Sequence, residues 1–529
     1  MSGGRKKVLW VDDEIEFLRS HIMFLETRGY SVIPVFSGDD AIQMLQENPK
    51  EFDIVLLDEQ MPGKDGLTTL EEIKEFLPDL PVVMVTKSEE EQVMEDALGK
   101  KIDGYLTKPV NPSQILLVCK KLLDSKRIMS SQISQKFVRS YTDLRKTLSG
   151  KLSLQDWVKM YESVVRWDLE LETVENEGLR QTLAGLKSEC NTAFSNFIMD
   201  HYGEWIRGIG PLPTMAPGII DKYLVPLLND GKKVAFVVLS GMRLDQYYDI
   251  EQSLKKFYDV RRGYFFSIIP SATPFSRNAL LAGAFPAEIA QRCPDLWKDG
   301  NEDSSVANRM ESQLMSQKLA TKGIDCPVDE PWFTKIKTTT DVKELLDRVK
   351  QCRKSQVMTF VIDFFDLLMQ NRTSSSMLQE ITNDESGFRA LTQSWFQRSS
   401  LLHLLKELAE LDYTVVVTSD HGSTSCSRGT ELYGVTDWVK NHRYKFGKEI
   451  SCDERTVLYL GEPTHFGLPK FGDDVACIIA KENYYFIHHE KFEHYHRQYK
   501  NSFQQGGISM EELIMPIGIF SPLQSSSGT

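Results

Sequence analysis

The chain has 529 residues, enough for three or four domains at ~150 residues per domain. Hydrophobic residues make up 41% of it and charged residues 26%, with a mean hydropathy of -0.31, and this composition excludes a disordered chain, a collagen and a coiled-coil rod. The 62 Lys and Arg residues against 75 Asp and Glu give a net charge of -13, so nucleic-acid binding would need a local basic patch.

The cysteines and the apolar runs indicate the compartment. The eight cysteines form no Cys-x-x-Cys pair and no cluster, which is typical of reduced thiols rather than of a disulfide scaffold or a zinc ribbon. The apolar run at residues 8–11 ends at two aspartates and is too short for a signal peptide. No run approaches the ~18 apolar residues of a membrane helix. We therefore expect a cytoplasmic protein that does not insert into membranes.

Residues 1–125 are expected to form an α/β domain. Apolar runs of strand length alternate with amphipathic helical stretches, and continuous apolar runs are typical of strands buried on both faces. The alternation predicts a doubly wound, five-stranded parallel sheet. The expected strands are residues 7–11, 31–35, 54–57, 82–85 and 104–106.

Two further domains follow. Residues 126–215 carry helical stripes such as Ile133, Phe137, Tyr141 and Leu144, and they predict an α-helical bundle that serves as a spacer or a dimer-forming unit. A Gly- and Pro-rich stretch then marks a boundary, and residues 216–524 predict a larger α/β domain, followed by a disordered tail at 525–529. The expected strands of the larger domain are residues 234–239, 264–269, 358–362, 414–418, 457–460, 484–487 and 513–519.

Charged and polar residues follow the expected strands of the first domain. Asp12, Asp13 and Asp58 fall at carboxyl ends of parallel strands, the edge where ligands of open α/β sheets bind. Three carboxylates there would repel one another without a cation, and Mg²⁺ prefers oxygen ligands. Thr86 and Lys108 follow the fourth and fifth strands. Together these groups predict a site that transfers a phosphoryl group to Asp58 and binds the product.

The motifs VDDE, LLDEQMPGKDG, VTKSEEE and GYLTKPV resemble those of the receiver domain of bacterial response regulators. The resemblance implies that Asp58 is the phosphorylated residue and that Asp12 and Asp13 complete the Mg²⁺ site. It also implies that Thr86 and Lys108 hold the phosphoryl group, that Tyr105 is the switch aromatic, and that the Lys108-Pro109 bond is cis. Lys87 departs from the small residue usual after the switch threonine.

Two motifs of the third domain suggest further chemistry. In SATPFSRNAL, a proline at the first helical position would make Thr273 the helix N-cap, either an ordinary cap or a nucleophile where anions are stabilised. In TSDHGS, Asp420 and His421 follow a strand and could ligate Zn²⁺ or Mn²⁺, or form a metal-free hydrogen-bonded pair. Asp366, after the strand ending near residue 362, is a further candidate ligand.

With GGISMEELIMP at residues 506–516, these motifs resemble the PglZ domain of the alkaline phosphatase superfamily. A receiver, a helical bundle and a PglZ domain in this order resemble PorX-type response regulators, which are linked to type IX secretion. The resemblance implies a histidine kinase partner, a homodimer on phosphorylation and engagement of a sigma factor. It also implies, where the site is intact, two-metal phosphodiesterase activity on oligonucleotides.

Three positions depart from the superfamily pattern. Ser240 stands where a carboxylate is expected, and Gln370 and Gln505 replace histidines of the Asp-x-x-x-His and His-Gly-Gly motifs. Glutamine is a weak zinc ligand compared with histidine, so we expect poor zinc binding and impaired hydrolysis. Asp245 or His465 could supply a substitute ligand through a local shift.

Three functions compete. The leading interpretation is a signalling protein in which phosphorylation of Asp58 controls dimerisation and partner binding, with the PglZ domain as a scaffold. The second is a phosphorylation-gated, metal-dependent phosphodiesterase. The third is a DNA-binding transcription factor. The sequence argues against it because it has no basic recognition helix near the C-terminus.

Overall fold

The computed structural model describes residues 5–87, 102–174, 176–297, 308–326, 332–336, 355–372, 375–435, 441–489 and 499–523, together with residues 346, 349 and 496. The expected tail at residues 525–529 and residues 88–91 of the motif VTKSEEE lie outside this description. The chain forms two compact units, residues 1–136 and 137–529.

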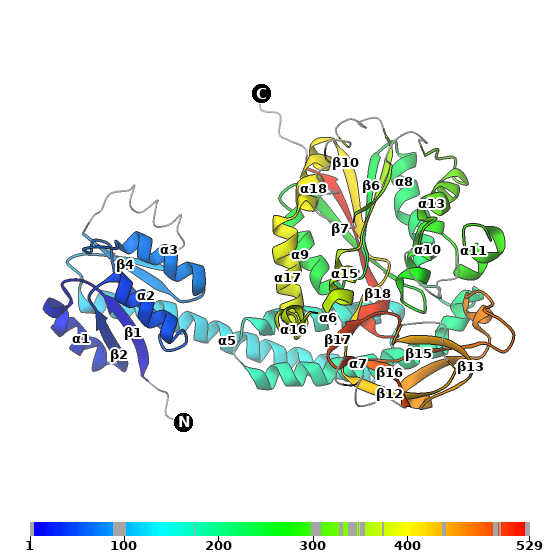
Figure 1. The fold of residues 1–529 in the computed structure, drawn as a ribbon. Helices are drawn as coiled ribbons and strands as arrows, with labels where there is room; N and C mark the ends of the chain where they lie inside the picture. Colours follow the sequence, from blue (N-terminus) through cyan, green and yellow to red (C-terminus); the bar gives the residue numbers. More distant parts are fainter. Residues whose placement is uncertain are drawn as a thin grey trace. The chain divides into compact units, whose positions relative to one another are not determined.

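The N-terminal unit contains a parallel five-stranded sheet in the order β2-β1-β3-β4-β5 (Figure 1). Alternate residues of β1 to β4 enter two hydrophobic clusters, one against α2 and α3 and the other against α1 and the start of α5. Burial on both faces explains the continuous apolar runs. The strands are β1 (Lys6–Val11), β2 (Tyr30–Val35), β3 (Ile54–Asp58), β4 (Val82–Thr86) and β5 (Gly104–Thr107), and the helices are α1 (Arg19–Glu26), α2 (Gly38–Glu47), α3 (Gly66–Phe76) and α5 (Pro112–Leu148).

Long helices connect the two α/β domains. Helix α5 crosses the boundary between the compact units as one element, and α6 (Leu154–Glu172) and α7 (Glu177–Ile206) follow. Ser153 is the N-cap of α6. Its side chain accepts a hydrogen bond from the backbone N–H of Asp156, and the Asp156 side chain accepts one from the backbone N–H of Ser153, which together form a capping box. Phe137 of α5 packs edge-on against Trp167 of α6. The expected helical middle segment is confirmed.

The C-terminal domain is built on a six-stranded sheet in the order β7-β18-β10-β6-β9-β8. The strands β10, β6, β9 and β8 are parallel, whereas β18 and β7 complete the sheet as antiparallel neighbours. Figure 1 shows α9, α17 and α18 on one face of this sheet and α8, α10 and α13 on the other. The strands are β6 (Lys233–Leu239), β7 (Tyr258–Phe266), β8 (Phe333–Ile336), β9 (Val357–Ile362), β10 (Tyr413–Thr418) and β18 (Ile514–Pro522).

The helices of this domain are short and connect the strands. They are α8 (Val225–Asn229), α9 (Leu244–Leu254), α10 (Thr273–Ala282), α11 (Pro286–Arg292), α13 (Glu311–Ala320), α15 (Phe364–Arg372), α16 (Ser376–Ile381), α17 (Glu385–Arg398), α18 (Ser400–Glu410) and α20 (Met510–Leu513). In the described part of the chain, no helix combines the length and apolar character needed to cross a membrane.

Two smaller sheets lie between β10 and α20 in the sequence. One has five strands in the order β14-β15-β13-β12-β16, and the other pairs β11 with β17. Only two of these seven strands, β14 and β16, were expected from their apolar runs. The strands are β11 (Thr424–Cys426), β12 (Arg428–Val435), β13 (Tyr444–Ser451), β14 (Val457–Leu460), β15 (Ala476–Ala480), β16 (Tyr484–His488) and β17 (Ser502–Gln504). The α/β class expected from the sequence is confirmed, and the six-stranded C-terminal sheet is mixed.

Candidate functional site

Three aspartates meet at the carboxyl edge of the N-terminal sheet. Asp12 and Asp13 follow β1 and Asp58 ends β3, and their ligand atoms lie within 4.8 Å of one another. Among the described residues, no other three carboxylate, imidazole or thiolate groups come as close. The ammonium of Lys108 lies 2.9 Å from Asp12 Oδ2 and 3.0 Å from Asp58 Oδ2. An all-oxygen donor set of this kind suits Mg²⁺.

The electrostatics of this aspartate cluster favour a bound cation. Burial raises the pKa of Asp58, and the negative charges of Asp12 and Asp13 add to this, although Lys108 opposes them. Burial alone would lower the pKa of Lys108, but its hydrogen bonds with Asp12 and Asp58 outweigh burial and raise that pKa. Lys108 neutralises only part of the negative charge of the three carboxylates, and a divalent cation would neutralise the rest.

The other expected residues of this site lie along the same edge. The hydroxyl of Thr86, which is 2% exposed, donates a hydrogen bond to the carboxylate of Glu59. Glu59 and Asp13 line an open cavity of about 500 Å³. Tyr105 is half-buried on β5 and accepts a hydrogen bond from Thr107 at 3.1 Å. The Lys108–Pro109 peptide bond is cis.

A second polar cluster lies at the corresponding edge of the C-terminal sheet. The parallel register aligns Thr418 with Val238 and Leu239 with Ile362, so β6, β9 and β10 end side by side. The residues after these strands therefore meet, as expected for an open α/β sheet. We call the group the Thr273 cluster; its members are Ser240, Thr273, Asp366, Asp420, His421 and Gln505.

Thr273 stands at the centre of this cluster. Its hydroxyl lies 2.7 Å from Asp366 Oδ2, 3.0 Å from His421 Nε2 and 3.1 Å from Gln505 Oε1. The expectation that Thr273 caps α10 is wrong by one residue, because Ala272 is the N-cap and Thr273 the first helical residue. The Thr273 hydroxyl therefore makes no capping hydrogen bond to α10 and bonds instead to groups from other elements.

A hydrogen bond to the main chain fixes the role of the His421 ring. His421 is fully buried, and its Nδ1 lies 2.9 Å from the carbonyl oxygen of Gly422. A carbonyl can only accept, so Nδ1 carries the proton in the neutral ring. Nε2, which faces Thr273, is then left as an acceptor.

The carboxylates of the Thr273 cluster lack compensation. The Ser240 hydroxyl lies 3.0 Å from both Asp366 Oδ2 and Asp420 Oδ2, and its single proton serves one at a time. Among the described residues, the buried Oδ1 atoms of Asp366 and Asp420 have no hydrogen-bond partner. Burial raises the pKa of Asp420, the negative charge of Asp366 adds to this, and the neighbouring Arg277 opposes it. Two orphaned carboxylate oxygens beside an imidazole and a hydroxyl fit one divalent cation.

The two glutamines that stand at expected histidine positions, Gln370 and Gln505, lie in different surroundings. Gln505 contacts Thr273, whereas Gln370 lies one turn after Asp366 on α15 and is exposed. Asp366 and Gln505 thus lie close together, because both bond to the hydroxyl of Thr273.

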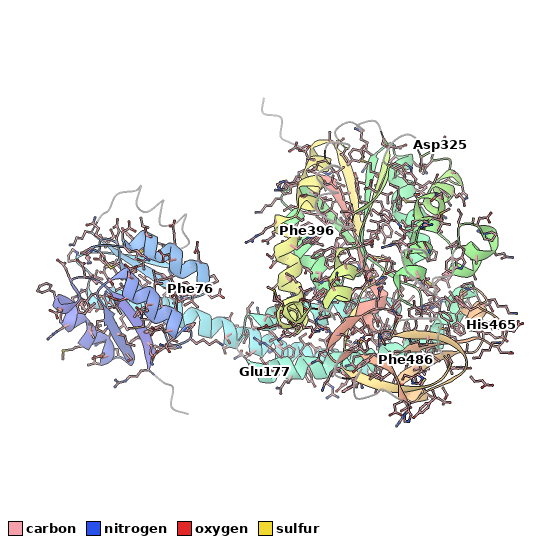
Figure 2. All side chains as sticks on the ribbon, in the orientation of Figure 1. Phe76, Glu177, Asp325, Phe396, His465 and Phe486 are labelled. Carbon is pink, nitrogen blue, oxygen red and sulfur yellow. The ribbon has the colours of Figure 1, made fainter. Side chains whose placement is uncertain are left out.

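Neither Asp245 nor His465 is placed to act as a substitute metal ligand at the Thr273 cluster. Arg243 and Arg389 contact the Asp245 carboxylate at 2.7 and 2.6 Å. Burial alone would raise the pKa of Asp245, but these two cations hold it well below its usual range. His465 is 73% exposed at the rim of the domain, where it pairs with Glu462 (Figure 2).

Two residues that support the sites were not recognised in the sequence. Glu59, the residue after Asp58, bonds to Thr86. Arg277, one turn after Thr273 on α10, is 4% exposed and bonds to Glu311 and Asp363 at 2.5 Å each. Glu59 lies within LLDEQMPGKDG and Arg277 within SATPFSRNAL, but the sequence does not show which residue either charged side chain contacts.

The chain matches known families in three consecutive segments, and its N-terminal fold is that of a response regulator receiver domain. Residues 8–120 match the response regulator receiver domain, 127–206 the PorX response regulator linker domain, and 219–520 the BREX system PglZ alkaline phosphatase-like domain. The last match covers more than half of the chain. The chain therefore belongs to the PglZ alkaline phosphatase-like family, and its domain order is that of a PorX-type response regulator.

Individual relatives match the receiver domain. It is 36% identical over 118 residues to the transcriptional regulatory protein ResD of Bacillus subtilis, with 22% of this chain and 48% of ResD covered. It is 33% identical over 135 residues to ZraR of Klebsiella oxytoca, with 26% of this chain and 30% of ZraR covered. The chain thus spans less than half the length of these curated relatives.

A solved structure matches the same region. The crystal structure of the CheX-CheY-BeF3-Mg+2 complex from Borrelia burgdorferi contains a chain that is 28% identical, with 23% of this chain and 90% of that chain covered and a TM-score of 0.22.

Proposed function

We propose that the protein is a response regulator that accepts a phosphoryl group on Asp58 from a histidine kinase, with Mg²⁺ held by Asp12, Asp13 and Asp58. The observation that carries the proposal is the contact of Lys108 with both Asp12 and Asp58 beside an open cavity. Lys108 would hold a phosphoryl oxygen on Asp58, while the bound cation would supply charge compensation during transfer.

Phosphorylation controls assembly in this proposal. Thr86 leaves Glu59 to bond with the phosphoryl group, and the surface next to Tyr105 changes with it. A shift from mostly monomer to mostly dimer needs only a few kcal/mol of differential stabilisation. The PorX-type domain order is the ground for proposing a sigma factor as the downstream partner and a role in type IX secretion.

The PglZ domain acts mainly as a scaffold and is a weak hydrolase at most. Ser240 offers a hydroxyl between two carboxylates that already lack compensation, and Gln505 offers an amide. Such a set supports one divalent cation rather than the pair about 4 Å apart that two-metal hydrolysis uses. Zinc in particular would be held weakly.

A second candidate, a metal-dependent phosphodiesterase acting on oligonucleotides, is favoured by the contact between Thr273 and His421. The Thr273 oxygen would bond to phosphorus as the bond from phosphorus to the ester oxygen breaks, and His421 Nε2 would take the hydroxyl proton and pass it to the departing oxygen. Water would then release the phosphoryl group from Thr273. Asp366 and Asp420 would hold the divalent cation, which would stabilise charge on the phosphoryl oxygens.

Sedimentation with beryllofluoride, a phosphoryl mimic, tests the leading proposal. We expect Mg²⁺ and beryllofluoride to convert the wild-type protein from monomer to dimer and to leave Asp58→Asn unchanged. Glu16→Gln, at an exposed carboxylate of the same domain, is the matched control and should behave as wild type. Identical wild-type profiles with and without beryllofluoride, across a wide range of protein concentrations, would rule out the assembly switch.

A further inference from the structure

One face of helix α7 contacts a single short segment of the PglZ domain. Lys187, Asn191 and Ser195 are spaced by four residues and therefore share a face of the helix. Ser195 donates to the carbonyl oxygen of Ile508 at 3.1 Å, and Lys187 and Asn191 both reach Glu511. We call residues 505–512 the bridging segment.

Asn191 makes the most specific of these contacts. Its amide nitrogen donates to Glu511 Oε2 at 3.0 Å, and its amide oxygen accepts from the backbone N–H of Met510 at 2.9 Å. Asn191 is 7% exposed and Glu511 is 2% exposed, so water does not compete for these bonds. A side chain that both donates and accepts thus fixes two adjacent residues of the bridging segment.

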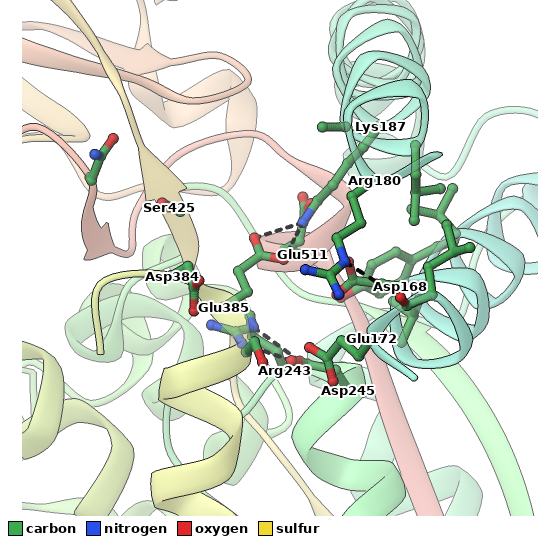
Figure 3. A pocket seen from close by; sticks show the side chains of 18 of the residues that line it. Asp168, Glu172, Arg180, Lys187, Arg243, Asp245, Asp384, Glu385, Ser425 and Glu511 are labelled. Atoms are coloured by element: carbon green, nitrogen blue, oxygen red, sulfur yellow. Dashed lines mark hydrogen bonds and ion pairs between the residues drawn. The ribbon is translucent and has the colours of Figure 1, made fainter. Parts of the chain in front are cut away.

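Lys187 adds an ion pair beside a cavity. Its ammonium lies 3.1 Å from Glu511 and 2.7 Å from Glu385. Figure 3 shows these three side chains pointing toward one another. The cavity, of about 550 Å³, is lined by α6, α7, the start of α17 and Glu511. Lys187 and Asn191 therefore both hold the Glu511 side chain at the edge of this cavity.

The bridging segment touches the Thr273 cluster on two sides. Next to His421, the N–H of Gly422 donates to the carbonyl oxygen of Glu512, and a Cβ atom at Gly422 would collide with the carbonyl oxygen of Glu511. Beside Thr273, Gln505 contacts its hydroxyl, and Ser271 donates to the carbonyl oxygen of Gly507 at 2.8 Å.

We propose that Asn191 is a positioning residue for the Thr273 cluster: through Glu511 and the bridging segment, the linker helix α7 sets where Gly422 holds the His421 ring. A shift of the α7 face would move Glu511, then the Gly422 carbonyl that orients Nδ1, and so the distance from Nε2 to Thr273. The functional meaning of this link rests on the proposed reactivity of Thr273.

The test monitors the His421 ring directly. In protein with ¹⁵N-labelled histidine, the His421 ring signals are assigned by their loss in His421→Gln. Asn191→Asp places a second carboxylate against Glu511, and we expect it to shift the His421 signals. Asn191→Ala, which adds no charge, should shift them as well. Asn196→Asp, on an exposed position of α7, is the control and should leave them unchanged.

Exchanging the donor and the acceptor between residues 191 and 511 should restore the wild-type His421 ring signals. In the double variant Asn191→Asp with Glu511→Gln, the amide of residue 511 donates to the carboxylate of residue 191, which still accepts from Met510. We expect the wild-type His421 signals to return. The proposal is overturned if folded Asn191→Ala and Asn191→Asp leave the signals unchanged, or if the double variant does not restore them. Because no hydrolysis is measured, an inactive Thr273 site would leave this test intact.

Discussion

The hydroxyl of Thr86 donates its hydrogen bond to Glu59, the residue next to Asp58, and not to Asp58 itself. A phosphoryl group on Asp58 must therefore compete with Glu59 for Thr86. Removing the competitor should stabilise the phosphorylated form. We predict that Glu59→Ala binds beryllofluoride about fivefold more tightly than wild type, in keeping with the ~1 kcal/mol of one hydrogen bond.

Calorimetric titration in the presence of Mg²⁺ measures this change. Glu16→Ala, at an exposed position, is the control and should match wild type. Equal or weaker binding by Glu59→Ala would show that Glu59 does not restrain Thr86.

The second prediction concerns stability and pH. Burial, with the charges of Asp12 and Asp13, raises the pKa of Asp58 above its ordinary value of 3.8. Ionised Asp58 therefore costs the folded state free energy, and the free energy of unfolding falls as the pH rises from about 3.8 through the raised pKa. Asp58→Asn should be more stable than wild type at pH 7, by on the order of 1 kcal/mol.

Urea unfolding of the two proteins checks the sign. The advantage of Asp58→Asn should shrink below pH 4, where wild-type Asp58 is protonated, and should also shrink when Mg²⁺ compensates the carboxylates. An advantage that grows on acidification would contradict the assigned direction of the pKa shift.

The third prediction concerns the cation of the Thr273 cluster. Ser240→Asp places a third carboxylate between Asp366 and Asp420 in a fully buried position. Without a cation this should cost roughly 3–5 kcal/mol of unfolding free energy, the range for an uncompensated buried charge. Added Zn²⁺ should recover most of the loss, and EDTA should reverse the recovery in thermal unfolding. Ser240→Ala is the control, and Zn²⁺ should stabilise it less than it stabilises Ser240→Asp; a loss in Ser240→Asp that Zn²⁺ leaves unchanged would argue against a cation site.

The fourth prediction is that hydrolysis is weak in the natural protein and can be rebuilt. Ser240→Asp and Gln505→His together should raise zinc content and phosphodiester turnover, while each change alone should do little because a two-metal site works as a unit. Adding Thr273→Val should abolish the gain. Robust phosphodiester cleavage by the unaltered protein that a chelator removes would instead establish an active enzyme.

The receiver could be predicted from sequence because its strands are continuous apolar runs and its polar residues stand at strand ends. A parallel sheet brings such ends together whatever the helices between them contain, so Asp12, Asp58 and Lys108 were expected to meet. Their roles in phosphoryl transfer remain proposals. The partner of Thr86 could not be foreseen, since Glu59 reads as an ordinary surface acid.

The PglZ domain was less predictable. Its smaller sheets contain short strands with charged residues, such as β12 and β13, which lack continuous apolar runs. The exposure of Gln370 depends on how α15 packs, and motif spacing does not encode that. The contact between Asn191 and Glu511 joins residues 320 positions apart, a separation over which periodicity carries no information.

The central claim, that Asp58 receives the phosphoryl group, is tested most directly by intact-mass measurement after incubation with a small phosphodonor and Mg²⁺. The wild-type protein should gain the mass of one phosphoryl group, Glu16→Gln should gain the same, and Asp58→Asn should gain none. A wild-type protein that remains unmodified, or an equal gain in Asp58→Asn, would contradict the claim.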